Sequence, residues 1–461
     1  MNWNFQNTYT KLPNVYYSDT KPHDFENPRL ILFNSDLANE LNLNVNSNEE
    51  EICDFLLGKK NKEKKFFSQA YAGHQFGNFT ILGDGRALLL GEHVYKNNRF
   101  DIQLKGSGQT PYSRNGDGKA ALGPMIREYL VSEAMHHLHV SSTRALAVIS
   151  TGEKIKREKF EPGAILVRVA KSHIRVGTFQ FGSLLKNKNY FNNLIDYTIS
   201  RLHPEIKNKS DKYLILFNKI CEQQMSLILD WMRVGFIHGV MNTDNMSLSG
   251  ETIDYGPCAF MDNYNPKMVY SSIDKMGRYS FENQSKIALW NLARFAETFL
   301  HLVDKNEKTS IKLIEEILEK HNKKFQESWI NMMSKKLNLE ITGDNKKLIK
   351  DFLDLMHIYK LDYTNTFVSL EKDILDKKIF GDWLTKYKSM VSKKYDEINP
   401  RVIPRNHIIE NIINKTYDDE FSELNKFNEV LKKPYENDNV GHEFTNPPQE
   451  HEKVYQTFCG T

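Results

Sequence analysis

The segment from Phe236 to Asp254, FIHGVMNTDNMSLSGETID, combines the residue types that phosphate chemistry requires. Mg²⁺ prefers oxygen ligands, and an attacking hydroxyl needs a nearby carboxylate to take its proton. Asn245 and Asp254 stand nine residues apart and could supply two metal ligands from the two ends of a hairpin. Asp244 lies next to Asn245 and could act as the base. The structural alternative is an Asx-turn at Asp244 and a hairpin position for Asp254.

The same segment is similar to the catalytic loop of kinase-like phosphotransferases, with one displacement. Such loops often read H-G-D-x-x-x-x-N, and the base follows the histidine by two positions. The chain has His238 and Gly239, but Val240 stands in the place of the base and cannot accept a proton. Asp244, beside the expected metal ligand, is the nearest replacement.

Lys105 lies in an apolar segment, DIQLKGSG, that is expected to form a strand. A lysine inside such a strand is costly unless it meets an anion. A phosphate is one candidate partner, and Glu128, 23 residues later on an expected helix, is another. Kinase folds use a strand lysine and a helix glutamate to orient ATP phosphates. The alternative is an edge-strand lysine that points to solvent.

Two glycine-rich turns could let backbone N–H groups approach a phosphate, because glycine has no side chain. Gly83 and Gly85, with Arg86, belong to the first turn. Asp117 and Gly118 belong to the second, RNGDGKA. Each turn taken alone could be an ordinary surface turn.

Two arginines could neutralise a polyphosphate. Arg168 and Arg175 flank the end of an expected strand, and arginine forms bidentate contacts with phosphate oxygens. A single arginine is usually a surface residue, so it is the convergence of these residues with Lys105 and the glycine-rich turns that favours a nucleotide site.

The elements that must position these residues fall into a strand-rich and a helical part. Two strands around an Asp84-Gly85 hairpin turn are expected in Phe79–Tyr95. Further strands are expected in Phe100–Gly106 and Ala164–Ala170. Apolar residues that recur every four positions predict a helix over Gly123–Leu138.

After about residue 186 the pattern becomes helical. Apolar stripes predict helices over Asp211–Val234 and Phe281–Val303, and most of Lys305–Lys394 is typical of amphipathic helix. A short helix is expected around Asp36–Leu43, and a polar loop from about Lys432. We predict an α+β fold with an N-terminal extension over 1–65, a strand-rich lobe over 66–185, a helical lobe over 186–410 and a C-terminal segment over 411–461.

Composition excludes several classes of protein. The net charge of +3, against 62 basic and 59 acidic side chains, gives no argument for nucleic-acid or membrane binding. The start has no secretory signal, and no apolar run approaches the length of a membrane span. The four cysteines form no C-x-x-C pair. A cytoplasmic monomer is expected.

Several long stretches strongly resemble the selenoprotein O family of protein adenylyltransferases. They run from about residue 69 to about residue 406. The stretches are QAYAGHQFGNF (Gln69–Phe79), LGDGRALLLGE (Leu82–Glu92), DIQLKGSGQTPYSRNGDGKAALGPMIREYL (Asp101–Leu130), LVRVAKSHIRVGTFQ (Leu166–Gln180), IHGVMNTDNMSLSGETIDYGPCAFMD (Ile237–Asp262), GRYSFENQ (Gly277–Gln284) and NPRVIPRN (Asn399–Asn406).

The resemblance implies a two-lobed pseudokinase fold that holds ATP reversed, so that AMP passes to Ser, Thr or Tyr hydroxyls of proteins. Asp244 would be the base, and Asn245 and Asp254 would hold Mg²⁺ or Mn²⁺. The implied nucleotide contacts are Gly83, Gly85, Arg86, Lys105, Asp117, Gly118, Arg168, Arg175 and Asp254. The alternatives are a kinase that uses the γ-phosphate and an ATP-binding scaffold without turnover; UTP is a possible second donor.

The C-terminus departs from the family pattern. Some members carry selenocysteine there, with a cysteine three residues before it. This chain has Cys459, but Gln456 stands three residues earlier, so the pair is absent. A bond between Cys459 and Cys258 is conceivable, and we expect Cys459 to be dispensable for activity under reducing conditions.

Overall fold

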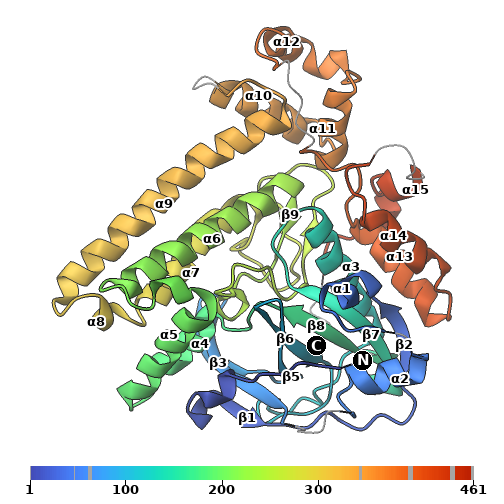
Figure 1. Ribbon diagram of the computed structural model, residues 1–461. Helices are drawn as coiled ribbons and strands as arrows, with labels where there is room; N and C mark the ends of the chain where they lie inside the picture. Colours follow the sequence, from blue (N-terminus) through green and yellow to red (C-terminus); the bar gives the residue numbers. More distant parts are fainter. Residues whose placement is uncertain are drawn as a thin grey trace.

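The computed structural model is a mixed α and β protein with a large antiparallel sheet and many helices (Figure 1). The structure describes residues 2–45, 47–60, 65–341, 345–392, 398–436 and 442–457. The first part of the chain forms the sheet, and the second part supplies most of the helices. Cys459, and the end of the predicted helical stretch at Lys394, lie outside the described residues.

Within the described residues, eight strands form the large sheet in the order β1-β3-β5-β6-β8-β7-β2, with β4 paired to β3. Neighbouring strands are antiparallel. The strands are β1 (Tyr17–Asp19), β2 (Arg29–Phe33), β3 (Phe67–Gln75), β4 (Asn78–Gly83), β5 (Ala87–Tyr95), β6 (Asn98–Lys105), β7 (Arg144–Lys156) and β8 (Phe160–Ala170).

Helices cover both faces of this sheet. α3 (Leu122–His137) packs against β7 and β8, and confirms the helix predicted there. α1 (Ser35–Glu40) and α2 (Glu49–Leu56) supply a separate core on the opposite face. Along β5, Leu89 belongs to the core that contains α3, and Leu90 to the core that contains α1 and α2. This alternation follows from the two-residue period of a strand.

The predicted hairpin around Asp84-Gly85 is wrong in its pairing. Both strands form, but β4 pairs with β3, whereas β5 pairs along its length with β6. The tight turn is instead Phe76-Gly77, where φ is 50° and 90°, as a two-residue hairpin turn requires. Asp84 ends β4 by exchanging hydrogen bonds with the backbone of Gln69, at 2.9 and 3.0 Å.

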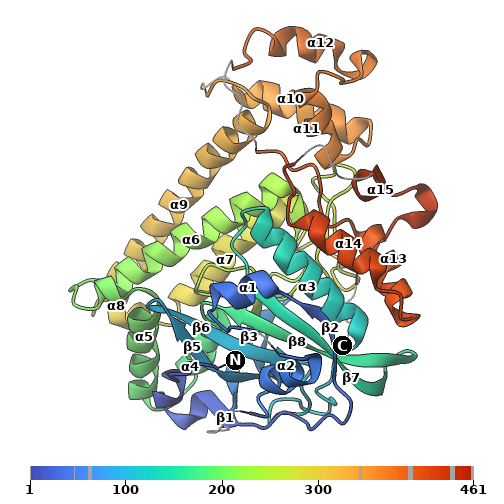
Figure 2. The ribbon, with the colours of Figure 1, turned by 45° about the vertical axis from the view of Figure 1, so that its right-hand side comes forward.

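The helical part begins after β8, and α9 carries α10 to α12 away from the sheet (Figures 1 and 2). α6 confirms the predicted helix over Asp211–Val234, whereas Phe281–Val303 is broken into a 3₁₀ turn and two helices. The helices are α4 (Val176–Ser183), α5 (Lys188–Leu202), α6 (Lys212–Val234), α7 (Gln284–Ala296), α8 (Leu300–Val303), α9 (Glu307–Lys336), α10 (Asn345–Ile358), α11 (Tyr363–Glu371), α12 (Lys377–Tyr387), α13 (Asn406–Tyr417), α14 (Ser422–Leu431) and α15 (His442–Thr445).

The segment that carries Asn245 and Asp254 is not the simple hairpin that was predicted. Strands β9 (Phe236–Ile237) and β10 (Ala259–Phe260) pair with each other and close it at its base. Its interior pairs with other parts of the chain, because Ser247 bridges to Arg175 and Thr252 bridges to Ser142. Pairing with the strand-rich part therefore fixes this loop.

No described helix is long and apolar enough to cross a membrane.

A buried arginine joins the C-terminal helices to the rest of the helical part. Arg405, which is 1% exposed, precedes α13. Its guanidinium donates to Asp262 at 2.6 Å and to both carboxylate oxygens of Asp362 at 2.8 and 3.0 Å. Asp362 also caps α11 through the Asn365 amide at 2.7 Å. One side chain thus fixes three separate segments.

We expect Arg405→Ala to lower the free energy of unfolding by roughly 3–5 kcal/mol, because two largely buried carboxylates lose their cation. Arg29→Ala is the matched control, since the Arg29–Asp419 pair is more than half exposed on both sides and should contribute less than about 1 kcal/mol. Denaturant unfolding of both variants measures the difference. Equal losses would contradict the role assigned to Arg405.

Candidate active site

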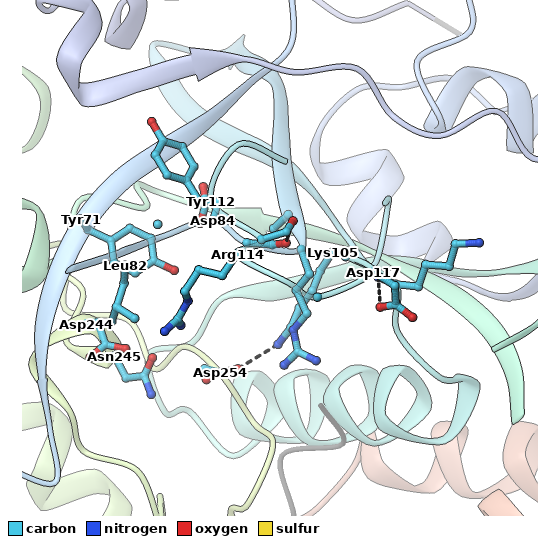
Figure 3. A pocket seen from close by; sticks show the side chains of 18 of the residues that line it. Tyr71, Leu82, Asp84, Lys105, Tyr112, Arg114, Asp117, Asp244, Asn245 and Asp254 are labelled. Atoms are coloured by element: carbon cyan, nitrogen blue, oxygen red, sulfur yellow. Dashed lines mark hydrogen bonds and ion pairs between the residues drawn. The ribbon is translucent and has the colours of Figure 1, made fainter. Parts of the chain in front are cut away.

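A cavity of about 740 Å³ is lined by all eleven residues that the sequence analysis expected to act as base, metal ligand or nucleotide contact (Figure 3). Strands β3 to β6 form one wall, the loop after β6 forms the roof, and the Asp244–Asp254 loop lies opposite. In Figure 3, Asp244 and Asn245 lie at one end of the cavity, Asp117 lies at the other, and Lys105 lies between them. Eight basic and four acidic side chains line the cavity, so its lining suits a polyanion.

Lys105 pairs with Glu128 as predicted from the sequence. Its ammonium lies 2.5 Å from Glu128 Oε2 and 2.8 Å from Asp254 Oδ1. Arg168 Nη1 donates to the other oxygen of Glu128 at 3.1 Å, and the Arg168 guanidinium also bonds to Gln103. Because Glu128 is buried under two cations, it holds both in place.

Asp254 is held in an unusual backbone conformation beside these cations. Its φ is 69°, a left-handed value that non-glycine residues rarely adopt, and such strain is concentrated at functional sites. Burial alone would raise the pKa of the Asp254 carboxyl, but Lys105, Arg86 and Arg168 hold it well below its ordinary value. Asp254 therefore stays ionised, as a metal ligand must.

Asp244 has the opposite electrostatic environment. It lies in a short 3₁₀ turn, Thr243–Asn245, and is 6% exposed. Burial raises the pKa of its carboxyl to about 6, although Arg175 and a hydrogen bond from Gln75 lower it in part. Oδ1 of Asp244 is buried and has no hydrogen-bond partner in the described chain. A carboxylate oxygen with these properties is suited to accept a proton.

The β3–β4 hairpin positions the turn that carries Asp244. The backbone N–H of His74 donates to Thr243 Oγ1 at 2.7 Å, and that of Phe76 donates to Asn242 Oδ1 at 3.1 Å. Gly73 lies directly over the carboxylate, since a Cβ there would stand 2.2 Å from Asp244 Oδ1. The hairpin can approach Asp244 only because this residue is glycine.

A neutral histidine couples the Asp244 turn to Asp254. His238 Nε2 donates to the carbonyl of Ile253 at 2.9 Å, and its Nδ1 accepts from the backbone N–H of Val240 at 3.3 Å. These partners select one tautomer, and burial lowers the pKa of the ring. The carbonyl of Val240 accepts from Asn245 Nδ2 at 3.0 Å, which leaves Asn245 Oδ1 available as a ligand.

The loop after β6 packs closely against the first glycine-rich turn and, at Gly118, against itself. Thr110 and Ser113 donate to the carbonyls of Asp84 and Gly85, and thereby tie the loop after β6 to the end of β4. A Cβ on Gly83 would stand 2.4 Å from the Tyr112 ring. One on Gly118, where φ is 67°, would stand 2.1 Å from the carbonyl of Gly108. Both turns therefore require glycine.

Several lining residues escaped the sequence analysis. Arg157 pairs with Asp117 at 2.8 Å, and Arg175 stacks on Tyr71 at 4.3 Å. Arg114, at a φ of 53°, extends into the cavity between Asp244 and Lys105 (Figure 3). The signal that identifies Arg114 is its place in RNGDGKA, close to the predicted contacts Asp117 and Gly118.

The residues present fit ATP and a divalent cation. Two buried polar atoms of the lining residues, Asp244 Oδ1 and Arg175 Nη2, have no hydrogen-bond partner in the described chain, although Arg175 Nη2 lies 3.9 Å from Asp84 Oδ1. Asn245 and Asp254 supply oxygen ligands, which Mg²⁺ prefers, and substrate phosphates and water commonly complete such a site. Among the described residues, no group of three His, Cys, Asp or Glu side chains could hold a metal by itself. The chain would thus hold the cation together with the nucleotide.

We expect Gly73→Ala to lower the rate of catalysis by about 10²-fold, because displacement of a reactive group by about an ångström has effects of this size. Gly381→Ala is the control, since a Cβ there meets no heavy atom within 4 Å. Activity and melting temperature should be measured on both. Full activity of Gly73→Ala would show that the Asp244 carboxylate need not occupy this position.

Comparison with known proteins gives a consistent result. A family model described as "Protein adenylyltransferase SelO" matches residues 1–432. Among similar curated proteins, each described as "Protein nucleotidyltransferase YdiU", one from Pelagibacter ubique is 48% identical, and the alignment covers 100% of this chain and 99% of the relative. Relatives from Brevibacillus brevis and Clostridium perfringens are each 46% identical, with 100% of this chain and 98% of the relative covered.

Proposed function

The chain belongs to the SelO family of protein adenylyltransferases, and on this premise we propose that it moves AMP from ATP to Ser, Thr or Tyr hydroxyls of target proteins. Membership of this family makes it a nucleotidyltransferase. One observation carries the proposal: a single cavity is lined both by Asp244, whose buried Oδ1 has no hydrogen-bond partner in the described chain, and by a cationic cluster. The cluster consists of Arg86, Lys105, Arg168 and Arg175.

The proposed fold is a kinase-like pair of lobes with the cavity between them. The strand-rich lobe would span 66–185 and the helical lobe 186–410, with extensions at both ends. The pairing of a strand lysine with a helix glutamate, Lys105 with Glu128, supports this interpretation because kinases use the same pair.

The proposed orientation of ATP is reversed, with the terminal phosphates away from the base. Lys105 is 5% exposed and lies apart from the Asp244 end of the cavity (Figure 3). Arg168, also 5% exposed, shares Glu128 with Lys105. Terminal phosphates at this cationic cluster, with Asp117 and Gly118 beyond it, would leave the α-phosphate nearest to Asp244. Pyrophosphate would then leave from the cationic part of the cavity with its charge neutralised.

In the proposed reaction, the target hydroxyl oxygen forms a bond to the α-phosphorus of ATP. The bond from that phosphorus to the α–β bridging oxygen breaks, and pyrophosphate departs with the electron pair. Asp244 takes the hydroxyl proton, and Lys105 and Arg168 stabilise the departing charge. Asn245 and Asp254 would hold Mg²⁺ or Mn²⁺, which when bound neutralises phosphate oxygens.

We expect label from the α-phosphate of ATP to appear on protein and label from the γ-phosphate to remain in pyrophosphate. The physical reason is the displaced base, because Val240 cannot accept a proton where a γ-directed enzyme of this loop type keeps its carboxylate. The two labelled nucleotides are incubated in parallel, and label on protein is counted. Incorporation of γ-label alone would replace the proposal with a kinase; no incorporation of either label, with ATP bound, would favour a scaffold.

We expect Asp244→Asn to lower the rate by about 10²–10⁴-fold, the usual contribution of a general base. Binding of ATP should persist, because the amide keeps the side-chain shape and Asn245 and Asp254 are unchanged. The rate of α-label transfer and the nucleotide affinity are measured on the same preparation. An unchanged rate would remove Asp244 from the role of base.

A further inference from the structure

A mixed aromatic, apolar and cationic surface lies beside the Asp244 turn. It consists of Phe79 on β4, Trp290 on α7, and Met276 and Arg278 in the loop before α7. The Phe79 and Trp290 rings lie 5.0 and 5.3 Å from the ring of His74, and the Arg278 guanidinium lies 4.7 Å over Trp290. We call these four residues the Arg278 surface.

The Arg278 guanidinium has no counter-ion among the residues that the structure describes. It lies over the rings of Trp290 and Tyr279, and no described carboxylate is within ion-pairing distance of it. Asp274, the nearest acid in its own loop, instead accepts from the backbone N–H groups of Arg278 and Tyr279 at 2.9 and 2.8 Å. An arginine fixed on aromatic faces and lacking a carboxylate is prepared to bind one from another molecule.

A second arginine on the same tryptophan shows the contrast. Arg294 lies 5.2 Å over Trp290, but it pairs with Glu297 at 2.5 Å. Both arginines therefore lie over the Trp290 ring, but only Arg294 is paired with a described carboxylate, that of Glu297.

The Arg278 surface is directly connected to the candidate active site. Tyr279, the next residue, donates from its hydroxyl to Asn242 Oδ1 at 2.7 Å, two residues before Asp244. The same oxygen accepts from Phe76 at the hairpin tip, and a Cβ on Gly77 would lie 3.9 Å from the Arg278 guanidinium. A polypeptide with a hydroxyl at Asp244 has this surface as its neighbour.

Exposed apolar side chains flank the arginine on both segments. Phe79 and Ile81 on β4 are 43% and 60% exposed, and Ile273 and Met276 in the loop are 60% and 92% exposed. Single exposed apolar residues are ordinary, but a group of them around a site marks an interaction surface. The β3–β4 turn and this loop approach each other at Gly77, where a Cβ would lie 3.9 Å from the Arg278 guanidinium.

We propose that the Arg278 surface binds the segment of a protein substrate that flanks the target hydroxyl. The segment carries an acidic side chain that pairs with Arg278 and an apolar side chain that packs against Phe79 and Met276. The inference rests on the proposed function, because it presupposes a protein hydroxyl at Asp244. It adds the sequence chemistry that the enzyme would select: acidic and apolar residues near the modified position.

The first test uses the unaltered enzyme and short synthetic peptides with one Ser, Thr or Tyr. Asp, Asn or Lys is placed in turn at each of the three positions before and after the hydroxyl residue. In an extended chain, the second and third of these positions lie about 7–10 Å from that residue. We expect kcat/KM for transfer of α-label to be about tenfold higher with Asp than with Lys at one or more positions, the effect of one charge pair. Asn should fall between them.

The second test exchanges the charge on the enzyme. Arg278→Glu should invert the preference, so that Lys peptides exceed Asp peptides, and Arg278→Gln should abolish it. Arg294→Glu, the matched control, should keep the preference for Asp. An inversion by Arg294→Glu, or an unchanged preference in Arg278→Glu, would overturn the inference.

The outcomes separate the two proposals. Equal rates for Asp and Lys peptides at every position, with α-label transferred, would overturn the inference and leave the proposed function standing. Absence of α-label from both peptides and proteins would overturn both. Because the peptide series uses the unaltered chain, it decides the matter even where an Arg278 variant fails to fold.

Discussion

The contact of the Lys105 ammonium with two carboxylates is the interaction on which the rest of the site depends. Its distances of 2.5 Å to Glu128 and 2.8 Å to Asp254 join β6, α3 and the loop before β10. A buried charge that loses its partner costs several kcal/mol, so these three elements are fixed relative to one another. Arg168 shares Glu128, which extends the same constraint to β8. The cationic floor of the cavity is therefore part of what holds the sheet against the helical part.

The two aspartates of the site differ because of what surrounds them. Asp254 lies beside Lys105, and its pKa is well below the ordinary value. Asp244 is buried beneath Gly73, and its pKa is raised to about 6. Carboxyl groups whose environments drive their pKa values apart commonly divide roles, one remaining ionised and the other exchanging protons. The proposed metal ligand and the proposed base follow this division, which sequence spacing alone does not contain.

The sequence predicted a contact correctly where a residue type was unusual for its own strand or helix. It did not predict pairings that are determined by contacts between distant parts of the chain. A lysine in an apolar strand and a glutamate on a buried helix predicted the Lys105–Glu128 pair. The β3–β4 hairpin could not be found locally, because Asp84-Gly85 is the stronger turn signal. Phe76, at a positive φ, donates its N–H to Asn242, which is 166 residues away in the chain. The partners of Arg405 lie 143 and 43 residues away, beyond any local pattern.

The Val240 carbonyl offers a structural explanation for the proposed displacement of the base from position 240 to Asp244. That carbonyl accepts both the Asn242 N–H, at 2.8 Å, and Asn245 Nδ2, at 3.0 Å, and so orients the Asn245 side chain. What the loop needs at position 240 is thus its backbone, and the buried valine side chain contributes packing only. A carboxylate there would be buried away from the cavity lining, whereas Asp244 lines the cavity and its backbone carbonyl accepts from the Arg175 guanidinium. Under the proposed function, the loop would keep the metal ligand of a kinase-like arrangement, Asn245, and would carry the base at Asp244, which lines the cavity.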